Sequence, residues 1–508
     1  MDSAASAPVP PAPASPPQRI LVLGASGYVG THLVPYLAAR GHRVRAAARR
    51  LEALTVRGWD GVECVAADAL DPASLDRALA GIDVAYYLVH SMASGPSFPR
   101  LDREAARHFR DAAARAGVRR IVYLGGLQPA SGTSPHLASR GETGDLLREG
   151  PVAVTEVRAG VIIGPGSAAF EVIRDLVFHL PAMVTPRWVR SRSQPIALDD
   201  VLAYLERLPA LGDAATGAFD VGGPQVLTYE QLMRIFGDLV GRHPVIVPLP
   251  VLTPTLSSYW LNFVTAVPTN VARALIEGLA HDVLADDAPI RALVPRALMT
   301  YREAAAAALA IERETPDGGH WREGSMIFRR QRPDFAFYAK RMTAEATTAA
   351  SPADVWREVA AIGGENGYYF LDALWKIRGK LDEMAGGMGL VRRRRDPQDV
   401  EVGDVIDFWR VVAVEPGRRL TLLAEMRLPG AAALEFAVIP ESAGRTRLAI
   451  TAYFHPAGAP GLAYWHAVAP AHLVLFPGLA RAIVARAEAR TSGAGRAEVA
   501  EREGEFTR

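Results

Sequence analysis

Three glycines stand at every third position within residues 24–30, directly after the apolar run 20–23. Glycines at this spacing permit a tight turn and a close approach of backbone N–H groups to a ligand, and a helix that starts there adds the positive end of its dipole. Residues 31–40 suit such a helix, which Gly41 would end. The pattern predicts a strand, a turn and a helix that hold a dinucleotide pyrophosphate, with a purely structural glycine turn as the alternative. The predicted cofactor-binding residues of this turn are Gly24, Ala25, Ser26, Gly27, Tyr28, Val29 and Gly30.

Two arginines, Arg49 and Arg50, follow the run 43–48 that predicts the second strand. An acidic residue near this position would bind the ribose 2′-hydroxyl of NAD, whereas an arginine favours the 2′-phosphate of NADP. The alternative interpretation is that both side chains are solvated loop charges. We therefore predict NADP(H) as the preferred cofactor, with NAD(H) as the second choice.

The segment between Gly41 and Gly166 must position these groups, and it alternates short apolar runs with helix-like stretches. Such alternation is typical of βαβ units and predicts an α/β fold, a Rossmann-type doubly wound parallel sheet. The predicted strands are residues 44–48, 62–66, 84–89, 120–124 and 152–157. Ligands in such a sheet lie at the carboxyl ends of the strands. Further cofactor contacts are therefore predicted at Asp68, Ala69, Leu88, Val89, His90, Leu124, Gly125 and Ala159, although a structural histidine is the favoured interpretation of His90.

The GxxGxxG spacing resembles the short-chain dehydrogenase/reductase superfamily. Several later motifs are similar to its atypical or extended branch, which includes NmrA-like proteins, and to bacterial two-domain NAD(P)-binding oxidoreductases. These motifs lie at residues 87–92, 160–166, 186–189, 194–196, 199–200 and 222–224. The resemblance implies that Asp68 meets the adenine and that the segment after the fourth strand packs along the cofactor.

The superfamily's catalytic pattern is where this chain departs from the resemblance. Active members use a tyrosine as acid/base and a lysine four residues later, but this chain has no lysine before Lys340. At the equivalent place stand His136 and Arg140. In one interpretation His136 takes the acid/base role, its ordinary pKa near 6.5 being suitable, while Arg140 supplies a fixed positive charge and a ribose contact. In the other, hydride chemistry is lost and the domain only binds NADP(H).

Composition limits the partners. The 508 residues are 49% hydrophobic and 22% charged with a net charge of +1, which gives no reason to expect nucleic acid. The single cysteine, Cys64, excludes an intramolecular disulfide, and its apolar surroundings predict burial. No metal site is predicted, and the cytoplasm is the simplest compartment. The run 392–395 of four arginines is interpreted as a solvated loop; contact with a membrane surface is an alternative that we do not favour.

The predicted domain organisation has five parts. They are a disordered leader at 1–17, the NAD(P)-binding domain at 18–312, a linker at 313–334, a second domain at 335–490 and a flexible tail at 491–508. No bilayer span is predicted, because the most apolar segment, 462–484, contains prolines, histidines and an arginine.

The second domain shows a different periodicity. A helix is predicted near 352–361, strands at 405–414, 420–426, 432–439 and 447–454, and a closing helix at 466–487. This order resembles the α+β helix-grip fold of START and polyketide-cyclase-like domains, which enclose an apolar cavity. The aromatic residues Trp375, Trp409, Trp465, Tyr369 and Phe370 could line such a cavity or form an ordinary core.

The predicted function is an NAD(P)(H)-dependent oxidoreductase that acts on a carbonyl, enone or quinone of an apolar small molecule. The alternative is a non-catalytic NADP(H) sensor or assembly factor whose second domain carries a lipid or quinone.

Overall fold

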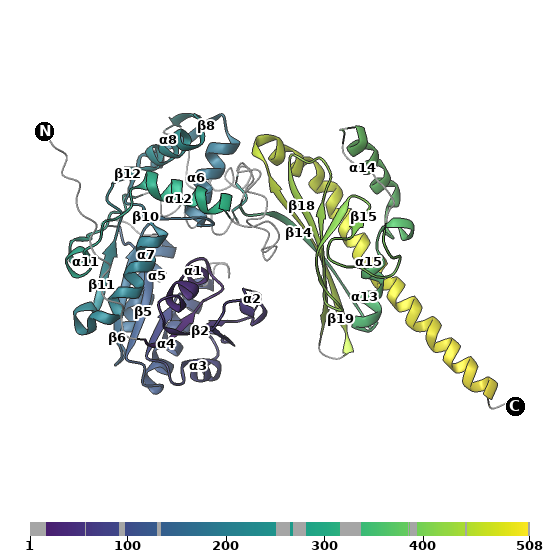
Figure 1. The fold of residues 1–508 in the computed structure, drawn as a ribbon, viewed down its shortest axis with the longest axis horizontal. Helices are drawn as coiled ribbons and strands as arrows, with labels where there is room; N and C mark the ends of the chain where they lie inside the picture. Colours follow the sequence, from purple (N-terminus) through teal and green to yellow (C-terminus); the bar gives the residue numbers. More distant parts are fainter. Residues whose placement is uncertain are drawn as a thin grey trace. The chain divides into compact units, whose positions relative to one another are not determined.

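The computed structural model describes two compact units, Met1–Glu312 and Arg313–Arg508 (Figure 1). The described residues are 17–55, 57–90, 97–129, 134–249, 265–267, 281–314, 337–384, 386, 394–441 and 444–505. Nearly all of the predicted leader, 1–17, and of the predicted linker, 313–334, lies outside these residues. Those two boundaries therefore stay predictions.

The first unit is built on a seven-stranded parallel sheet with the order β11-β6-β5-β4-β1-β2-β3. Its strands are β1 (Arg19–Leu23), β2 (Arg43–Ala48), β3 (Glu63–Ala66), β4 (Val84–Tyr87), β5 (Arg120–Gly126), β6 (Ala153–Ala159) and β11 (Gly217–Val221). The predicted strands between residues 44 and 157 are confirmed, whereas β11 was not predicted. The strand order reverses between β1 and β4, and this is the point where α/β sheets bind their ligands.

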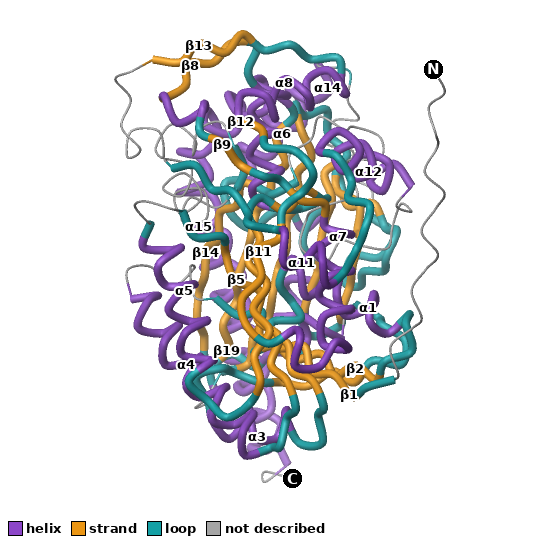
Figure 2. The backbone as a smooth tube through the Cα atoms, turned by 90° about the vertical axis from the view of Figure 1, so that its left-hand side faces the viewer, coloured by secondary structure: helices purple, strands orange, loops and turns teal. Residues whose placement is uncertain are grey.

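Helices cover both faces of this sheet. Figure 2 shows α4 and α5 on one side of β5 and α1, α7 and α11 on the other. Strand β1 alternates accordingly: Ile20 and Val22 join the core under α1 and α7, while Leu21 and Leu23 join the core under α3 and α4. The doubly wound fold is thus confirmed. The helices are α1 (Tyr28–Ala38), α2 (Glu52–Thr55), α3 (Pro72–Leu79), α4 (Phe98–Arg115), α5 (Pro135–Arg148), α7 (Leu198–Arg207) and α11 (Ala288–Leu293).

Three further α-helices and three small strand pairs are present in the part of the first unit that the structure describes. The helices are α6 (Ala168–His179), α8 (Tyr229–Val240) and α12 (Tyr301–Glu314). The pairs are β7 (Ile162–Ile163) with β10 (Ile196–Ala197), β9 (Arg192–Ser193) with β12 (Leu227–Thr228), and β8 (Ala182–Pro186) with β13 (Val245–Leu249).

The second unit contains a six-stranded antiparallel sheet with the order β14-β19-β18-β17-β16-β15. Its elements are β14 (Lys340–Thr348), α13 (Pro352–Ala360), α14 (Asp372–Met384), β15 (Val405–Ile406), β16 (Trp409–Glu415), β17 (Arg419–Ala424), β18 (Gly430–Pro440), β19 (Thr446–Pro456) and α15 (Gly458–Glu505). The long helix packs on the sheet, where Leu479 and Ile483 join a core that includes Leu434 and Phe436. An antiparallel sheet closed by a long helix was expected and is present; whether the domain is START-like stays a prediction.

The second unit differs from the expectations in three places. The predicted strand 405–414 is a hairpin, because Asp407 adopts a left-handed φ of 56° and its carboxylate accepts hydrogen bonds from the Gly364 N–H and the Tyr368 hydroxyl. Strand β14 and helix α14 were not predicted. Helix α15 starts earlier than expected. It also continues through residues 491–505, a stretch rich in alanine, glutamate and arginine, and the flexibility expected for residues 491–508 stays a prediction.

Two side chains differ from their expected environments. Cys64 is only half-buried, because β3 is the edge strand of its sheet. Arg394, expected in a solvated loop, is half-buried and donates hydrogen bonds to the carbonyl oxygens of Ala360 and Ile362, just after α13. It therefore satisfies carbonyl groups that the end of a helix leaves without partners.

One helix of the described chain, Gly458–Arg490 within α15, is long and apolar enough to span a membrane by length and composition. The apolar window has a mean hydropathy of 1.6, and 39% of it is buried inside the unit. Leu475, Phe476 and Leu479 of this helix belong to the core, so packing accounts for part of its apolar composition.

Candidate functional site

The turn between β1 and α1 has the shape that a pyrophosphate requires. Gly24 has a φ of 90°, and a Cβ there would lie 2.9 Å from the carbonyl oxygen of Leu88. A Cβ on Gly30 would lie 2.4 Å from the carbonyl oxygen of Gly24. Only glycine fits either position, because a side chain would meet backbone atoms that cannot move aside. The inner side of the turn is therefore closed by backbone atoms of the turn itself and of Leu88.

Helix α1 begins at this turn without a side chain that satisfies its first N–H groups. Its N-cap is Gly27, which is exposed, and the described first turn contains no acidic residue. Backbone N–H groups and the positive helix end are therefore available to an anion. The residues present fit the pyrophosphate of NAD(P)(H), and Ala25, Ser26, Tyr28 and Val29 complete the turn.

The residues predicted to bind the adenosine half follow the next two strands. Arg49 and Arg50 come directly after β2, and both are exposed. Asp68 and the buried Ala69 follow β3, and the Asp68 carboxylate accepts a hydrogen bond from the Leu70 N–H at 3.0 Å. This local bond fixes the carboxylate at the carboxyl edge of the sheet, beyond β2 and β3.

The residues predicted for the nicotinamide half follow β4, β5 and β6. Leu88 continues β4, its N–H bonding to the Leu23 carbonyl at 3.0 Å. Val89 is half-buried and His90 is exposed. Leu124 and Gly125 lie near the carboxyl end of β5. The last residue of this strand, Gly126, pairs in register with Ala159 of β6. The predicted residues thus follow neighbouring strand ends along one edge of the sheet.

His136 and Arg140 lie in the first two turns of α5. The helix starts after Ser134, whose hydroxyl accepts a hydrogen bond from the Leu137 N–H at 3.2 Å. From there the Arg140 guanidinium reaches back to β5, where Nη2 donates to the Leu124 carbonyl at 2.6 Å. A Cβ on Gly126 would lie 3.3 Å from the Arg140 Nε, so the glycine leaves room for the guanidinium.

The environment of His136 differs from the one expected for an acid/base histidine. Burial, together with the positive charge of Arg140 and the proximity of His90, lowers the pKa of His136 to about 3. The imidazole is therefore neutral at pH 7, and the premise of an ordinary pKa near 6.5 was wrong. A neutral imidazole still carries one N–H, which can donate a hydrogen bond to an oxygen that gains negative charge.

Several residues that support this region were not predicted. The Gln128 amide donates to the carbonyls of Gly126 and Leu137 at 3.0 and 3.1 Å, which ties β5 to α5. The Ser139 hydroxyl donates to the buried Asp102 carboxylate of α4 at 2.9 Å. Ser139 and Asp102 are 37 residues apart in the sequence, so no local pattern could reveal their contact.

Two motifs that carried the family resemblance have structural roles. The buried Gln194 amide donates to the Gly223 carbonyl at 2.8 Å and to the Asp287 carboxylate at 3.1 Å. Asp200, fully buried, accepts hydrogen bonds from Arg296 Nε at 2.6 Å and from the Met299 N–H at 3.0 Å. Both side chains therefore anchor residues 285–300 to the body of the unit.

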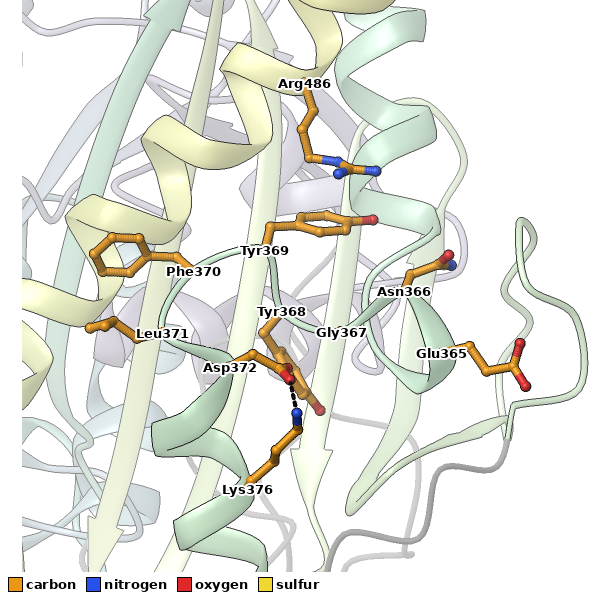
Figure 3. A pocket seen from close by; sticks show the side chains of 10 residues that line it. All are labelled: Glu365, Asn366, Gly367, Tyr368, Tyr369, Phe370, Leu371, Asp372, Lys376 and Arg486. Atoms are coloured by element: carbon orange, nitrogen blue, oxygen red, sulfur yellow. Dashed lines mark ion pairs between the residues drawn. The ribbon is translucent and has the colours of Figure 1, made fainter.

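The second unit has a hollow of about 350 Å³ beside α14, shown in Figure 3. Tyr369 and Phe370 line it, as predicted for a cavity, but Glu365, Asp372 and Arg486 also do, so the lining is largely polar. The three tryptophans Trp375, Trp409 and Trp465 are instead buried. Trp375 stacks on Tyr368 with ring centres 4.3 Å apart. The structure therefore supports the interpretation that these tryptophans belong to the hydrophobic core and do not line a cavity.

A doubly wound parallel sheet with a glycine turn at its switch point defines an NAD(P)-binding domain of the short-chain dehydrogenase/reductase type. A family model described as NAD(P)H-binding matches residues 24–159. A second model, described as a protein of unknown function (DUF2867), matches residues 333–479.

Two curated relatives that match the first unit are named as reductases. The chain is 34% identical over 231 residues to the (4-alkanoyl-5-oxo-2,5-dihydrofuran-3-yl)methyl phosphate reductase of Streptomyces griseus, which covers 43% of this chain and 74% of that protein. It is 28% identical over 236 residues to the ceramide reductase of Caulobacter vibrioides, which covers 46% of this chain and 73% of that protein. The chain belongs to the NAD(P)H-binding reductases. A solved NADPH-dependent quinone oxidoreductase of Escherichia coli aligns with a TM-score of 0.46 at 19% identity, covering 57% of this chain and 99% of that one.

Proposed function

We propose that the first unit uses NADPH to reduce a carbonyl, enone or quinone group of an apolar small molecule. The observation that carries this proposal is the placement of Arg140 and His136 on one helix next to the carboxyl end of β5. The N–H donor of His136 can stabilise a developing oxyanion, and the cation of Arg140 can contact the ribose. Bound cofactor supplies the hydride that adds to the substrate carbon.

In this proposal the protein's own residues act on the oxygen of the substrate. The N–H of neutral His136 donates a hydrogen bond to the carbonyl oxygen and stabilises the charge that develops on it. The proton that completes the alcohol comes from water, while the neutral His136 keeps its N–H as a hydrogen-bond donor throughout. Arg140, held by the Leu124 carbonyl, contributes a fixed positive charge and a contact to the ribose.

The relatives support a substrate that carries an aliphatic chain; the first of them is named for a phosphate, so its substrate carries an anionic group as well. Their names specify an alkanoyl compound and ceramide, both of which carry aliphatic chains. The preference for NADPH over NADH is supported by Arg49 and Arg50, which are exposed and directly follow β2, because an arginine after this strand favours a 2′-phosphate.

Oxidation of NADPH by the full chain, followed by absorbance with a panel of long-chain ketones, enones and quinones, tests this function. His136→Ala is expected to lower kcat on the order of 10²-fold while it changes the NADPH dissociation constant little. His281→Ala, at an exposed position, is the matched control and should retain full turnover.

The rival function, a non-catalytic NADP(H) sensor, is favoured by the replacement of the superfamily's tyrosine and lysine. It predicts that NADPH binds but is not oxidised with any member of the panel. In that case His136→Ala would have no measurable consequence.

A further inference from the structure

Helix α14 turns four of its large apolar side chains away from the core of the second unit. Its buried residues are Trp375, Gly379 and Asp382. Its exposed large apolar residues, which we call the α14 stripe, are Leu374, Ile377, Leu381 and Met384. At 3.6 residues per turn these four span an arc of about 80°, roughly opposite to the buried residues. The stripe is therefore a continuous apolar surface that faces solvent.

This concentration is unusual for the described surface of the second unit. Eight large apolar side chains are exposed there, and five of them, the stripe and Leu371, lie within residues 371–384. Two of the others, Leu473 and Val474, belong to α15, beside which α14 lies, as the Arg378 guanidinium 5.7 Å from the Tyr464 ring centre shows. Scattered exposed apolar residues need no explanation, but a contiguous patch marks a binding surface.

Positive charges flank the stripe on both sides. On the helical projection Lys380 borders one edge and Arg378 the other, whereas the acidic Asp372 and Glu383 lie farther round toward the body of the unit. Asp372 is also paired with Lys376 at 2.9 Å. Of the three lysines in the chain, two belong to this helix. An apolar stripe edged by cations is the pattern of a helix that lies in the interface of an anionic membrane.

We propose that the α14 stripe docks this protein on a lipid bilayer that contains anionic headgroups. In this arrangement Leu374, Ile377, Leu381 and Met384 enter the acyl boundary, while Lys380 and Arg378 contact the phosphates. The proposal concerns the second unit alone and does not depend on the reductase chemistry of the first.

The flanking charges favour a bilayer over a second copy of the chain. A two-fold contact would bring the same patch from both copies together, so the cationic edges of one stripe would meet those of the other. The anionic headgroups of a bilayer would instead neutralise them.

Flotation of the full chain with vesicles tests the proposal. Binding is expected to vesicles of phosphatidylcholine mixed with phosphatidylglycerol, and it should weaken as salt screens the cations. Replacing two stripe residues, Ile377→Glu with Leu381→Glu, should weaken binding at least about tenfold, because apolar burial is replaced by two carboxylates. Lys380→Glu should weaken binding only to the vesicles that contain phosphatidylglycerol.

Val402→Glu is the matched control, since Val402 is also exposed, to 65%, but lies outside the stripe. It should bind vesicles like the unaltered chain, and circular dichroism should show that all variants are folded. The proposal is overturned if the unaltered chain does not float with phosphatidylglycerol vesicles, or if Val402→Glu loses as much binding as the double variant. It is also overturned if sedimentation shows a dimer that the double variant dissociates while no vesicle binding occurs.

Discussion

The guanidinium of Arg140 on α5 donates a hydrogen bond to the main-chain carbonyl of Leu124 at the end of β5, over 2.6 Å. The bond holds a positive charge at the carboxyl edge of the sheet, where the superfamily places a lysine. An arginine can keep this bond and still offer further N–H groups to a ligand, because its guanidinium carries five donors.

This relationship predicts how substitutions at Arg140 affect cofactor binding. Arg140→Met removes the charge and the donor, and it should weaken NADPH binding at least about tenfold, since a charge-assisted hydrogen bond contributes ~1.5–3 kcal/mol. Calorimetric titration of NADPH measures this. Arg103→Met, which removes an equal charge from α4, is the control and should bind NADPH normally. If Arg140→Met and Arg103→Met bind NADPH with equal affinity, Arg140 does not contact the cofactor.

Gly24 should be intolerant of any side chain. Gly24→Ala places a Cβ within 2.9 Å of the Leu88 carbonyl oxygen at a φ of 90°, so we expect lost NADPH binding and a lower melting temperature. Gly41→Ala is the matched control, because Gly41 has a φ of 84° but no atom near its added Cβ. Its cost should be backbone strain alone, about 1–2 kcal/mol, with cofactor binding intact.

Cofactor preference should depend on Arg49. Arg49→Asp puts a carboxylate where the 2′-phosphate is expected, and it should reverse the order of the NADPH and NADH dissociation constants. Arg43→Asp makes the same charge change at the opposite end of β2 and should leave the order unchanged. If the unaltered protein binds both cofactors equally well, the assignment of Arg49 is wrong.

Acid should destabilise the first unit through His136. Its folded pKa is lowered to about 3, below the ordinary 6.5, so between these values the unfolded chain carries a proton that the folded chain lacks. Stability therefore falls as pH falls below 6.5, by at most ~1.4 kcal/mol per pH unit from this group. Urea unfolding at pH 7 and pH 5 should show a smaller loss for His136→Leu than for the unaltered protein. The exposed His281→Leu should show the full loss.

Two adjacent arginines of the second unit should differ in their contribution to stability. Arg394→Ala leaves the carbonyls of Ala360 and Ile362 without their donor and should cost about 1–3 kcal/mol of unfolding free energy. Arg395→Ala breaks only exposed ion pairs with Glu401 and Asp404 and should cost less than about 1 kcal/mol. Thermal melting of the two full-length variants compares them directly. Similar melting temperatures would contradict a structural role for Arg394.

The parts of the fold that local pattern determines were predictable. The strand, glycine turn and helix of residues 20–38 depend on neighbours in the sequence, and the predicted turn matches the structure. The hairpin at Asp407 was not predictable in the same way. Its apolar run is continuous, and the partners that bend it, Gly364 and Tyr368, lie about forty residues earlier.

In the candidate site, too, the features set by local sequence were predictable and those set by tertiary packing were not. The glycines and the arginines after β2 were located from spacing, whereas the pKa of His136 depends on burial and on the charge of Arg140, which only the packed structure supplies. Helix α14 carries a helical spacing of apolar residues, but that stripe faces solvent, while the residues facing the core include a glycine and an aspartate.

The pairing of β14 with β19 has a consequence for how the chain folds during synthesis. Lys340 pairs with Phe454, and Thr348 with Thr446. About a hundred further residues must therefore be synthesised before the partner strand of β14 is available. The ribosome adds about 5–20 residues per second, so β14 remains unpaired for several seconds. The first unit is complete by Glu312 and can fold in the meantime. Nascent chains released between residues 348 and 446 would expose an unpaired β14, and those are the species that a chaperone would have to protect.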